Sequence, residues 1–150
     1  AKNILGTQII SETIVTLGMD NTVIFGEEQK TTPRDVGEFF RNLWQGNFLS
    51  KESRDELLEF MTDTNFESWI VGGIPSDVRV SHKFGRELHV VNDAGIVFAS
   101  GPEGDEPSGQ DGPQGQGPFV LVILSKGVIE DEADTIFPEL AKAVYEIETR

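Results

Sequence analysis

The first half of the chain places its hydrophobic residues at helical spacing, and the second half places them at the spacing of strands. Along residues 1–17 the apolar positions fall on one broad face of a helix. They are Ile4, Leu5, Ile9, Ile10, Ile14 and Leu17. Gly18 predicts the end of this helix, because glycine readily takes the left-handed conformation that closes a last turn.

A second helix is predicted to begin after Thr32, a good capping residue that is followed by Pro33 and Asp35. Its apolar residues follow the spacing i, i+3, i+4, i+7, i+8, so we expect them to face the core. They are Val36, Phe39, Phe40, Leu43 and Trp44. Gly46 and Asn47 then predict the end of this helix.

A third helix is predicted after Ser50, which is also a good capping residue. Its pattern predicts an apolar inner face and a charged face toward solvent. The inner residues are Leu57, Leu58 and Met61, and the charged ones are Lys51, Glu52, Arg54, Asp55 and Glu56. Residues 65–75, which include Gly72 and Gly73, predict an irregular link into the strands.

Three strands are predicted in the second half of the chain. Side chains alternate along residues 78–88, with Val78, Val80 and His82 on one face and Arg79, Ser81 and Lys83 on the other. A second strand is expected over residues 90–99. Residues 119–124 are apolar without alternation, which is typical of a strand buried on both faces at the centre of a sheet.

A C-terminal helix is expected between residues 131 and 148. We expect it to bury Ile136 or Phe137, together with Leu140, Val144 and Ile147. Pro138 leaves two possibilities open, because a proline inside a helix removes a hydrogen bond. The helix either begins near Asp134 or Thr135, or it bends at the proline.

Residues 100–118 consist mainly of Gly, Pro, Gln, Ser and acidic residues and contain no large apolar side chain. Such a segment has nothing to bury that would offset the entropy lost on ordering it. We therefore predict a disordered excursion at the tip of the hairpin between the second and third strands. The insertion is expected to be tolerated rather than functional.

The composition narrows the classes of function. A chain of 150 residues fits one domain or a large piece of one, and its net charge of −14 argues against nucleic acid as a partner. Cysteine is absent and the two histidines lack the spacing of zinc motifs, so no metal site is expected. No apolar run approaches the roughly 18 residues of a membrane span, so no transmembrane segment is predicted in this chain.

The candidate chemistry lies at the end of the first predicted strand. A lysine at this point, Lys83, can direct a fixed positive charge into a cleft. Gly85 lets a ligand approach the backbone closely, and the N–H of Arg86 could then donate a hydrogen bond to it. A surface lysine beside a turn glycine is the alternative interpretation of the same residues.

Four stretches, in this order, resemble the C-terminal part of the class A serine β-lactamases and of the related penicillin-recognising peptidases. They are Thr31-Thr32-Pro33, His82-Lys83-Phe84-Gly85, Asn92-Asp93-Ala94-Gly95-Ile96-Val97, and the apolar run from Phe119 to Val128. In that family a strand carries K-T-G or K-S-G, the next strand carries a D-A-G-like sequence, and a third apolar strand leads to the C-terminal helix.

The resemblance implies an α+β fold of the β-lactamase/transpeptidase type, with an antiparallel sheet, a C-terminal helix packed on it and a helical subdomain. Residues 1–75 would be part of the helical subdomain, and residues 76–150 would supply the sheet and the C-terminal helix. In the family, the strand on the other side of residues 119–124 comes from the N-terminal part. A preceding segment or a second copy of the chain is therefore expected to cover that sheet edge.

The chain departs from the family in three ways. No serine is followed by lysine three residues later and no S-x-N occurs, so the nucleophile is expected outside this chain, before Ala1. The connector 19–30 lacks E-x-x-L-N, and its glutamates Glu27 and Glu28 are interpreted as solvated loop residues. Phe84 stands where the family has the hydroxyl that binds the substrate carboxylate.

The function implied is that of a bacterial serine hydrolase, periplasmic or secreted, which forms an acyl-enzyme with β-lactams or peptidoglycan peptides and could confer antibiotic resistance. Lys83 would be the catalytic anchor for the substrate carboxylate, and Phe84, Gly85 and Arg86 would contact the substrate. No cofactor is implied. The chain alone is predicted to be inactive, and the alternative is a non-catalytic pseudo-enzyme that binds a partner on the same scaffold.

Overall fold

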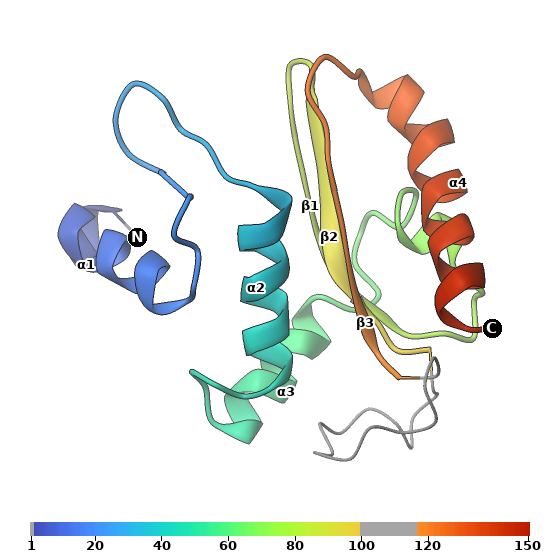
Figure 1. The fold of residues 1–150 in the computed structure, drawn as a ribbon, viewed down its shortest axis with the longest axis horizontal. Helices are drawn as coiled ribbons and strands as arrows, with labels where there is room; N and C mark the ends of the chain where they lie inside the picture. Colours follow the sequence, from blue (N-terminus) through green and yellow to red (C-terminus); the bar gives the residue numbers. More distant parts are fainter. Residues whose placement is uncertain (1, 100–116) are drawn as a thin grey trace.

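The structure is a computed structural model that describes residues 2–99 and 117–150. In this part of the chain, a three-stranded antiparallel sheet has α4 on one face and α2 and α3 on the other (Figure 1). The elements are α1 (Lys2–Thr16), α2 (Pro33–Trp44), α3 (Lys51–Phe60), η1 (Val71–Gly73), β1 (Val80–Glu87), β2 (Val90–Val97), β3 (Phe119–Leu124) and α4 (Glu130–Glu148). The predicted α+β architecture is confirmed.

The sheet is a meander in the order β1-β2-β3. Glu87 pairs with Val90 across a tight turn, and Val97 pairs with Phe119 across the predicted excursion, which lies outside the described residues except for its last two positions. Within the described residues β3 pairs with β2 alone, so it has a partner on one side, as the sequence predicted. Because its other edge is uncovered, only Leu121 of this strand is buried.

Each face of the sheet has its own core. On the α2 and α3 side, Phe40, Leu43 and Leu58 pack against Ile96 and Phe98 of the sheet region. The side facing α4 is built around buried residues from the sheet, the η1 turn and the helix, namely Val80, Val97, Leu121, Ile70, Ile74 and Ala141. A third cluster on this side contains Trp69, Val91, Ala133 and Phe137.

The start of α2 is fixed by Asp35, whose side chain is 2% exposed. Its carboxylate accepts hydrogen bonds from the N–H of Asn21 (2.8 Å), the hydroxyl of Thr22 (2.7 Å) and the hydroxyl of Thr32 (3.0 Å). Burial acts to raise the pKa of Asp35, but these hydrogen bonds outweigh it and hold the pKa below its ordinary value. Thr32 caps the helix as predicted, by accepting from the N–H of Asp35.

One residue of α3 differs from the prediction. Ser50 caps the helix as expected, but Arg54 is 5% exposed rather than on a solvated face. Its guanidinium lies 5.6 Å from the centre of the Trp44 ring and pairs with Asp55 (2.7 Å). A buried guanidinium is tolerated here because it stacks on an aromatic ring and keeps a carboxylate partner.

The predictions for α4 were wrong in two respects. The helix begins at Glu130 rather than near Asp134 or Thr135, and at its start Glu132 accepts a hydrogen bond from the N–H of Ile129 (3.1 Å); Pro138 lies inside it. Phe137 is buried as one of the two alternatives predicted, but Leu140 is 47% exposed and Ile147 is 62% exposed. The buried stripe instead contains two small residues: Ala141, where η1 approaches the helix closely, and Ala133, which packs in the cluster with Trp69.

The first helix forms as predicted and Gly18 closes it with a φ of 77°. However, Gly6 interrupts it with a non-helical conformation, and the helix stands away from the sheet, beyond α2 (Figure 1). Its apolar residues Ile9 and Val15 are 54% and 63% exposed.

Candidate functional site

Strand alternation places Lys83 and its two neighbours on opposite faces of β1. His82 and Phe84 lie on the α4 side, whereas Ser81 and Lys83 lie on the α2 and α3 side. Ser81 is buried there against Thr62, with 2.8 Å between the hydroxyl oxygens. The side chain of Lys83 is exposed, donates to the carbonyl of Phe84, and holds its ammonium 4.7 Å from the centre of the Phe84 ring.

Phe84 belongs to an aromatic cluster. Its ring centre lies 4.5 Å from that of Phe66 and 6.1 Å from that of Trp69, which in turn packs against Phe137. The half-buried ring therefore fills space beneath the strand that a threonine would leave empty. Whether position 84 also contacts a substrate stays a prediction.

In β1, the backbone N–H and C=O groups of the even-numbered residues point toward the outer edge of the strand, away from β2. The N–H of His82 donates to the carbonyl of Met61 (2.7 Å), which lies outside the sheet, whereas the carbonyl of Arg79 faces β2 and accepts from the N–H of Phe98. Polar backbone groups alternate in direction along an antiparallel strand, so the N–H of Arg86 points to the outer edge as well. This is the direction that a hydrogen bond to a bound substrate would require.

Gly85 and Arg86 follow at the outer edge of β1 and leave the space beside Lys83 open. A side chain built at Gly85 would meet no atom within 4 Å, so the space beside Lys83 is open. The Arg86 side chain turns away toward α4, where it pairs with Glu130, and its guanidinium lies 5.9 Å from the Phe66 ring. An exposed ammonium, an open glycine and an outward N–H thus lie within the four residues 83–86 of β1.

Sequence reasoning missed a buried hydrogen-bond network next to Lys83, on the α4 side of β1. His82 is 1% exposed and Asp93 is 0% exposed, and Nδ1 of the histidine lies 2.8 Å from the carboxylate. Nε2 lies 3.4 Å from Glu67 and 3.3 Å from the hydroxyl of Thr64. The available signal was a histidine and an aspartate on the inward faces of two neighbouring strands that are otherwise apolar.

The charge on His82 follows from these partners. Burial acts to lower the pKa of the imidazole, but the hydrogen bond to Asp93 and the charges of Asp93 and Glu67 outweigh burial, so its pKa is raised. Gly95 lies opposite the histidine in the sheet, and the close approach of the β1 backbone leaves no room for a side chain there. A Cβ at Gly95 would approach the carbonyl oxygen of Ser81 to 2.4 Å and Cα of His82 to 2.7 Å.

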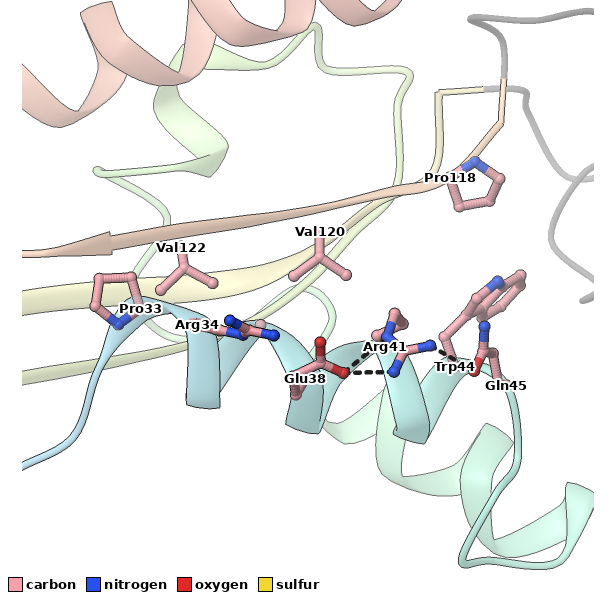
Figure 2. A pocket seen from close by; sticks show the side chains of 10 residues that line it. Pro33, Arg34, Glu38, Arg41, Trp44, Gln45, Pro118, Val120 and Val122 are labelled. Carbon is pink, nitrogen blue, oxygen red and sulfur yellow. Dashed lines mark hydrogen bonds and ion pairs between the residues drawn. The ribbon is translucent and has the colours of Figure 1, made fainter. Parts of the chain in front are cut away.

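A groove on the opposite edge of the sheet is separate from this site. It runs between α2 and β3 and is lined by Arg34, Glu38, Arg41, Trp44, Val120 and Val122, among others (Figure 2). Two of the lining residues, Arg41 and Glu38, form an ion pair with 2.5 Å between guanidinium nitrogen and carboxylate oxygen. Since β2 lies between β1 and β3, Lys83 does not border this groove.

Among residues 2–99 and 117–150, no group of three or more histidine, aspartate or glutamate side chains is arranged to hold a metal ion. In the same residues, none of the helices has the length and apolar character needed to cross a bilayer.

The fold and sequence were compared with known proteins. Among solved structures, PBP-A is 25% identical with a TM-score of 0.74, and the match covers 95% of this chain and 51% of that one. The β-lactamase of Sphaerobacter thermophilus DSM 20745 is 18% identical (TM-score 0.77, 98% and 55% covered). The TLA-1 extended-spectrum β-lactamase is 22% identical (TM-score 0.76, 97% and 55% covered), and both β-lactamases show likeness of fold alone.

This chain spans about half the length of the structures that it matches. A comparison with curated proteins found no match. The family model for the beta-lactamase enzyme family matches residues 1–105, which is more than two thirds of the chain and includes Lys83, Gly85 and the His82 network. On this match, the chain belongs to the beta-lactamase enzyme family.

Proposed function

We propose that the complete protein containing this chain is a serine hydrolase that acts on β-lactams or cell-wall peptides through an acyl-enzyme. One observation carries the proposal: in a member of this family, the Lys83 ammonium and the outward N–H of Arg86 lie beside the open Gly85. A cation and a backbone donor in this arrangement suit a substrate with a carboxylate and a reactive carbonyl. A PBP-A variant, 26% identical to this chain, has been seen as an acyl-enzyme complex with penicillin G.

In the proposed reaction, a serine oxygen from outside this chain bonds to the substrate carbonyl carbon. The amide C–N bond then breaks, and the proton from the serine hydroxyl ends on the nitrogen. Lys83 binds the substrate carboxylate and assists the proton transfer, while the N–H of Arg86 stabilises the negative charge that develops on the carbonyl oxygen. Substrates of this kind lie outside the cytoplasmic membrane, so we place the protein in the periplasm or outside the cell.

A second candidate function is binding without catalysis. Phe84 favours it, because its ring lies in the aromatic cluster where the family has a hydroxyl for the substrate carboxylate. Losing that hydrogen bond costs about 1–3 kcal/mol of recognition if no other group replaces it. On this alternative the scaffold and Lys83 would bind a peptide or partner without forming a covalent bond.

The test uses the complete protein, a reactive penicillin and intact-mass measurement of the acyl adduct over time. Lys83→Ala should slow acylation by about ten- to a hundredfold, as expected for the loss of one charge-assisted hydrogen bond. Lys142→Ala, at an exposed position on α4, is the matched control and should leave the rate unchanged. Equal rates for the two variants would remove Lys83 from the mechanism.

A parallel measurement on residues 1–150 alone locates the nucleophile. No serine of this chain lies in S-x-x-K, so no stoichiometric adduct should form. An adduct on any serine of these residues would overturn the placement of the nucleophile outside the chain. If the complete protein binds the penicillin reversibly and never forms an adduct, the non-catalytic alternative replaces the proposal.

A further inference from the structure

The buried pair of His82 and Asp93 has no part in the acylation chemistry proposed above, yet His82 immediately precedes Lys83 in β1 and Asp93 contacts it from β2. Neither side chain can touch a substrate, because they are 1% and 0% exposed. A histidine and an aspartate in the core cost more to bury than apolar residues of the same size. Their location beside the anchor lysine therefore calls for a physical reason.

The pair connects the strand to the segment that runs along its outer edge. Residues 61–70 are tied to β1 and β2 by successive contacts: Met61 accepts from the N–H of His82 (2.7 Å), and the N–H of Ile70 donates to Asp93 (3.0 Å). Between these points, Nε2 of His82 faces Glu67 (3.4 Å). The segment is thus held at both ends and at its middle by the two buried residues.

The charge of the imidazole decides whether the middle contact holds. The groups that face His82 are Asp93 from β2, and Glu67 and Thr64 from the 61–70 segment. The carboxylate of Asp134 on α4 is occupied by the indole N–H of Trp69 (2.8 Å). A protonated imidazole donates to Asp93 and Glu67 at once, whereas a neutral one that keeps its proton toward Asp93 turns a lone pair toward the Glu67 carboxylate.

We propose that His82 is a positioning residue for Lys83: clamped as an imidazolium between Asp93 and Glu67, it holds residues 61–70 against β1. This fixes the strand edge that presents the lysine and the Arg86 N–H. The inference rests on the function proposed above. When the imidazole loses its proton, the Glu67 carboxylate keeps the hydrogen bond from the Thr64 hydroxyl of its own segment (2.6 Å) but loses its bond to β1. The edge of β1 then loosens, and acylation slows.

The test compares two readouts in the complete protein. NMR titration gives the protonation curve of His82, whose signals are assigned by their absence in His82→Gln. Acylation by a reactive penicillin is followed over the same pH range. Glu67→Gln keeps a hydrogen-bonding group but removes the negative charge, and Glu67 is partly exposed, so this variant should fold. The control is Glu59→Gln, at an exposed carboxylate at the end of α3.

We expect Glu67→Gln to move the His82 titration and the alkaline fall in the acylation rate to lower pH by the same amount, and Glu59→Gln to move neither. His82→Gln should abolish that alkaline fall. A shifted titration with an unmoved rate profile would overturn the positioning role and leave the proposed function standing.

If the complete protein forms no acyl-enzyme, the proposed function fails, and the backbone amides decide the inference. The amide signals of Lys83 and Arg86 should then shift with the titration of His82 and lose that dependence in His82→Gln. If the chemical shifts of these two amides do not change as His82 titrates, the positioning role is overturned independently of any activity.

Discussion

Asp35 and Asp93 are both almost wholly buried carboxylates, and they differ in the charge of their partners. Asp93 faces the imidazole of His82, whereas Asp35 accepts from the neutral donors Asn21, Thr22 and Thr32. Neutral donors stabilise the ionised carboxylate without any cation. Through Asn21 and Thr22, Asp35 therefore links the connector 19–30 to the start of α2.

The lowered pKa of Asp35 sets the direction of its pH dependence. A carboxylate whose folded pKa lies below its unfolded value contributes stability above the unfolded pKa of 3.8, and that stability is lost as the pH falls through the folded pKa. Asp35→Asn should therefore lower the melting temperature at pH 7 and reduce its decline between pH 5 and pH 2. Asp20→Asn, at an exposed position, is the control. A full acid decline in Asp35→Asn would contradict this assignment.

Phe84 provides a prediction with two opposed effects. Phe84→Thr should cost about 1–3 kcal/mol of unfolding free energy, because a half-buried ring leaves its contacts with Phe66 and Trp69. The same variant should speed capture of carboxylate-bearing β-lactams by the complete protein, since a hydroxyl is restored beside Lys83. Urea unfolding and acylation kinetics measure the two effects. Destabilisation with an unchanged acylation rate would show that position 84 serves the aromatic cluster alone.

Residue-level prediction from the sequence succeeded where the cause is local. Thr32 and Ser50 cap their helices because a hydroxyl bonds a backbone N–H three residues on. Arg54 was placed wrongly because its exposure depends on Trp44, ten positions away in another helix. The His82 network was missed for the same reason, since Glu67 and Asp93 come from separate elements.

At the scale of elements, α4 shows what periodicity cannot supply. The apolar pattern favoured Leu140 and Ile147 as buried residues, yet the face that contacts η1 and the sheet carries Ala133, Phe137 and Ala141. At Ala141 only a small side chain fits, because the η1 turn comes within contact of the helix at this point. That close approach is a property of the pair of elements and leaves no periodic signal in either.

The close contact between η1 and α4 can be tested by substituting Gly73, with the adjacent Gly72 as the control. A Cβ at Gly73 would lie 2.1 Å from the carbonyl oxygen of Pro138 and 2.9 Å from Cβ of Ala141, so Gly73→Ala must push the turn off the helix. We expect a loss of about 1–3 kcal/mol, as for other overpacked cores. At Gly72 the nearest atom is 3.4 Å away, and Gly72→Ala should be nearly neutral in chemical denaturation. Similar losses at both positions would indicate a general intolerance of the turn.

At the scale of the whole molecule, the outer edge of β3 is a sheet edge without a partner strand in the described residues. No strand of the described residues pairs with it, and its side chains Val120 and Val122 border the groove beside α2. An open edge of this length and apolarity is a template for association. The division into residues 1–75 and 76–150 stays a prediction, although α2 and α3 pack directly on the sheet.

We expect that edge to be covered in solution, by a segment from the rest of the protein or by a second copy of the chain. Light scattering combined with intact-mass analysis of one sample distinguishes the two. A non-associating monomer of residues 1–150 whose amides from Phe119 to Leu124 exchange rapidly would show that neither occurs. A monomer in which those amides are protected would mean that another part of the same chain covers the strand.

The unequal connections of the meander have a consequence for the order of events in folding. Glu87 and Val90 are joined by a two-residue turn, whereas Val97 reaches Phe119 only through residues 98–118. Closing the longer loop costs about 2 kcal/mol more entropy, at roughly 0.6 kcal/mol per doubling of length. The β1–β2 hairpin should therefore form in the folding transition state, and β3 should join after it.

Because β3 joins after the transition state, replacing residues 100–116 by a short glycine-containing turn should slow unfolding and leave the refolding rate almost unchanged, as stopped-flow measurements over a range of urea concentrations would show. Conversely, Leu121→Ala should chiefly speed unfolding, because the contacts of β3 would be made late and lost early. A deletion that accelerates unfolding instead would mean that the segment contributes contacts to the native state. Formation of the β1–β2 hairpin, and not the capture of the last strand, is thus expected to limit the rate of folding.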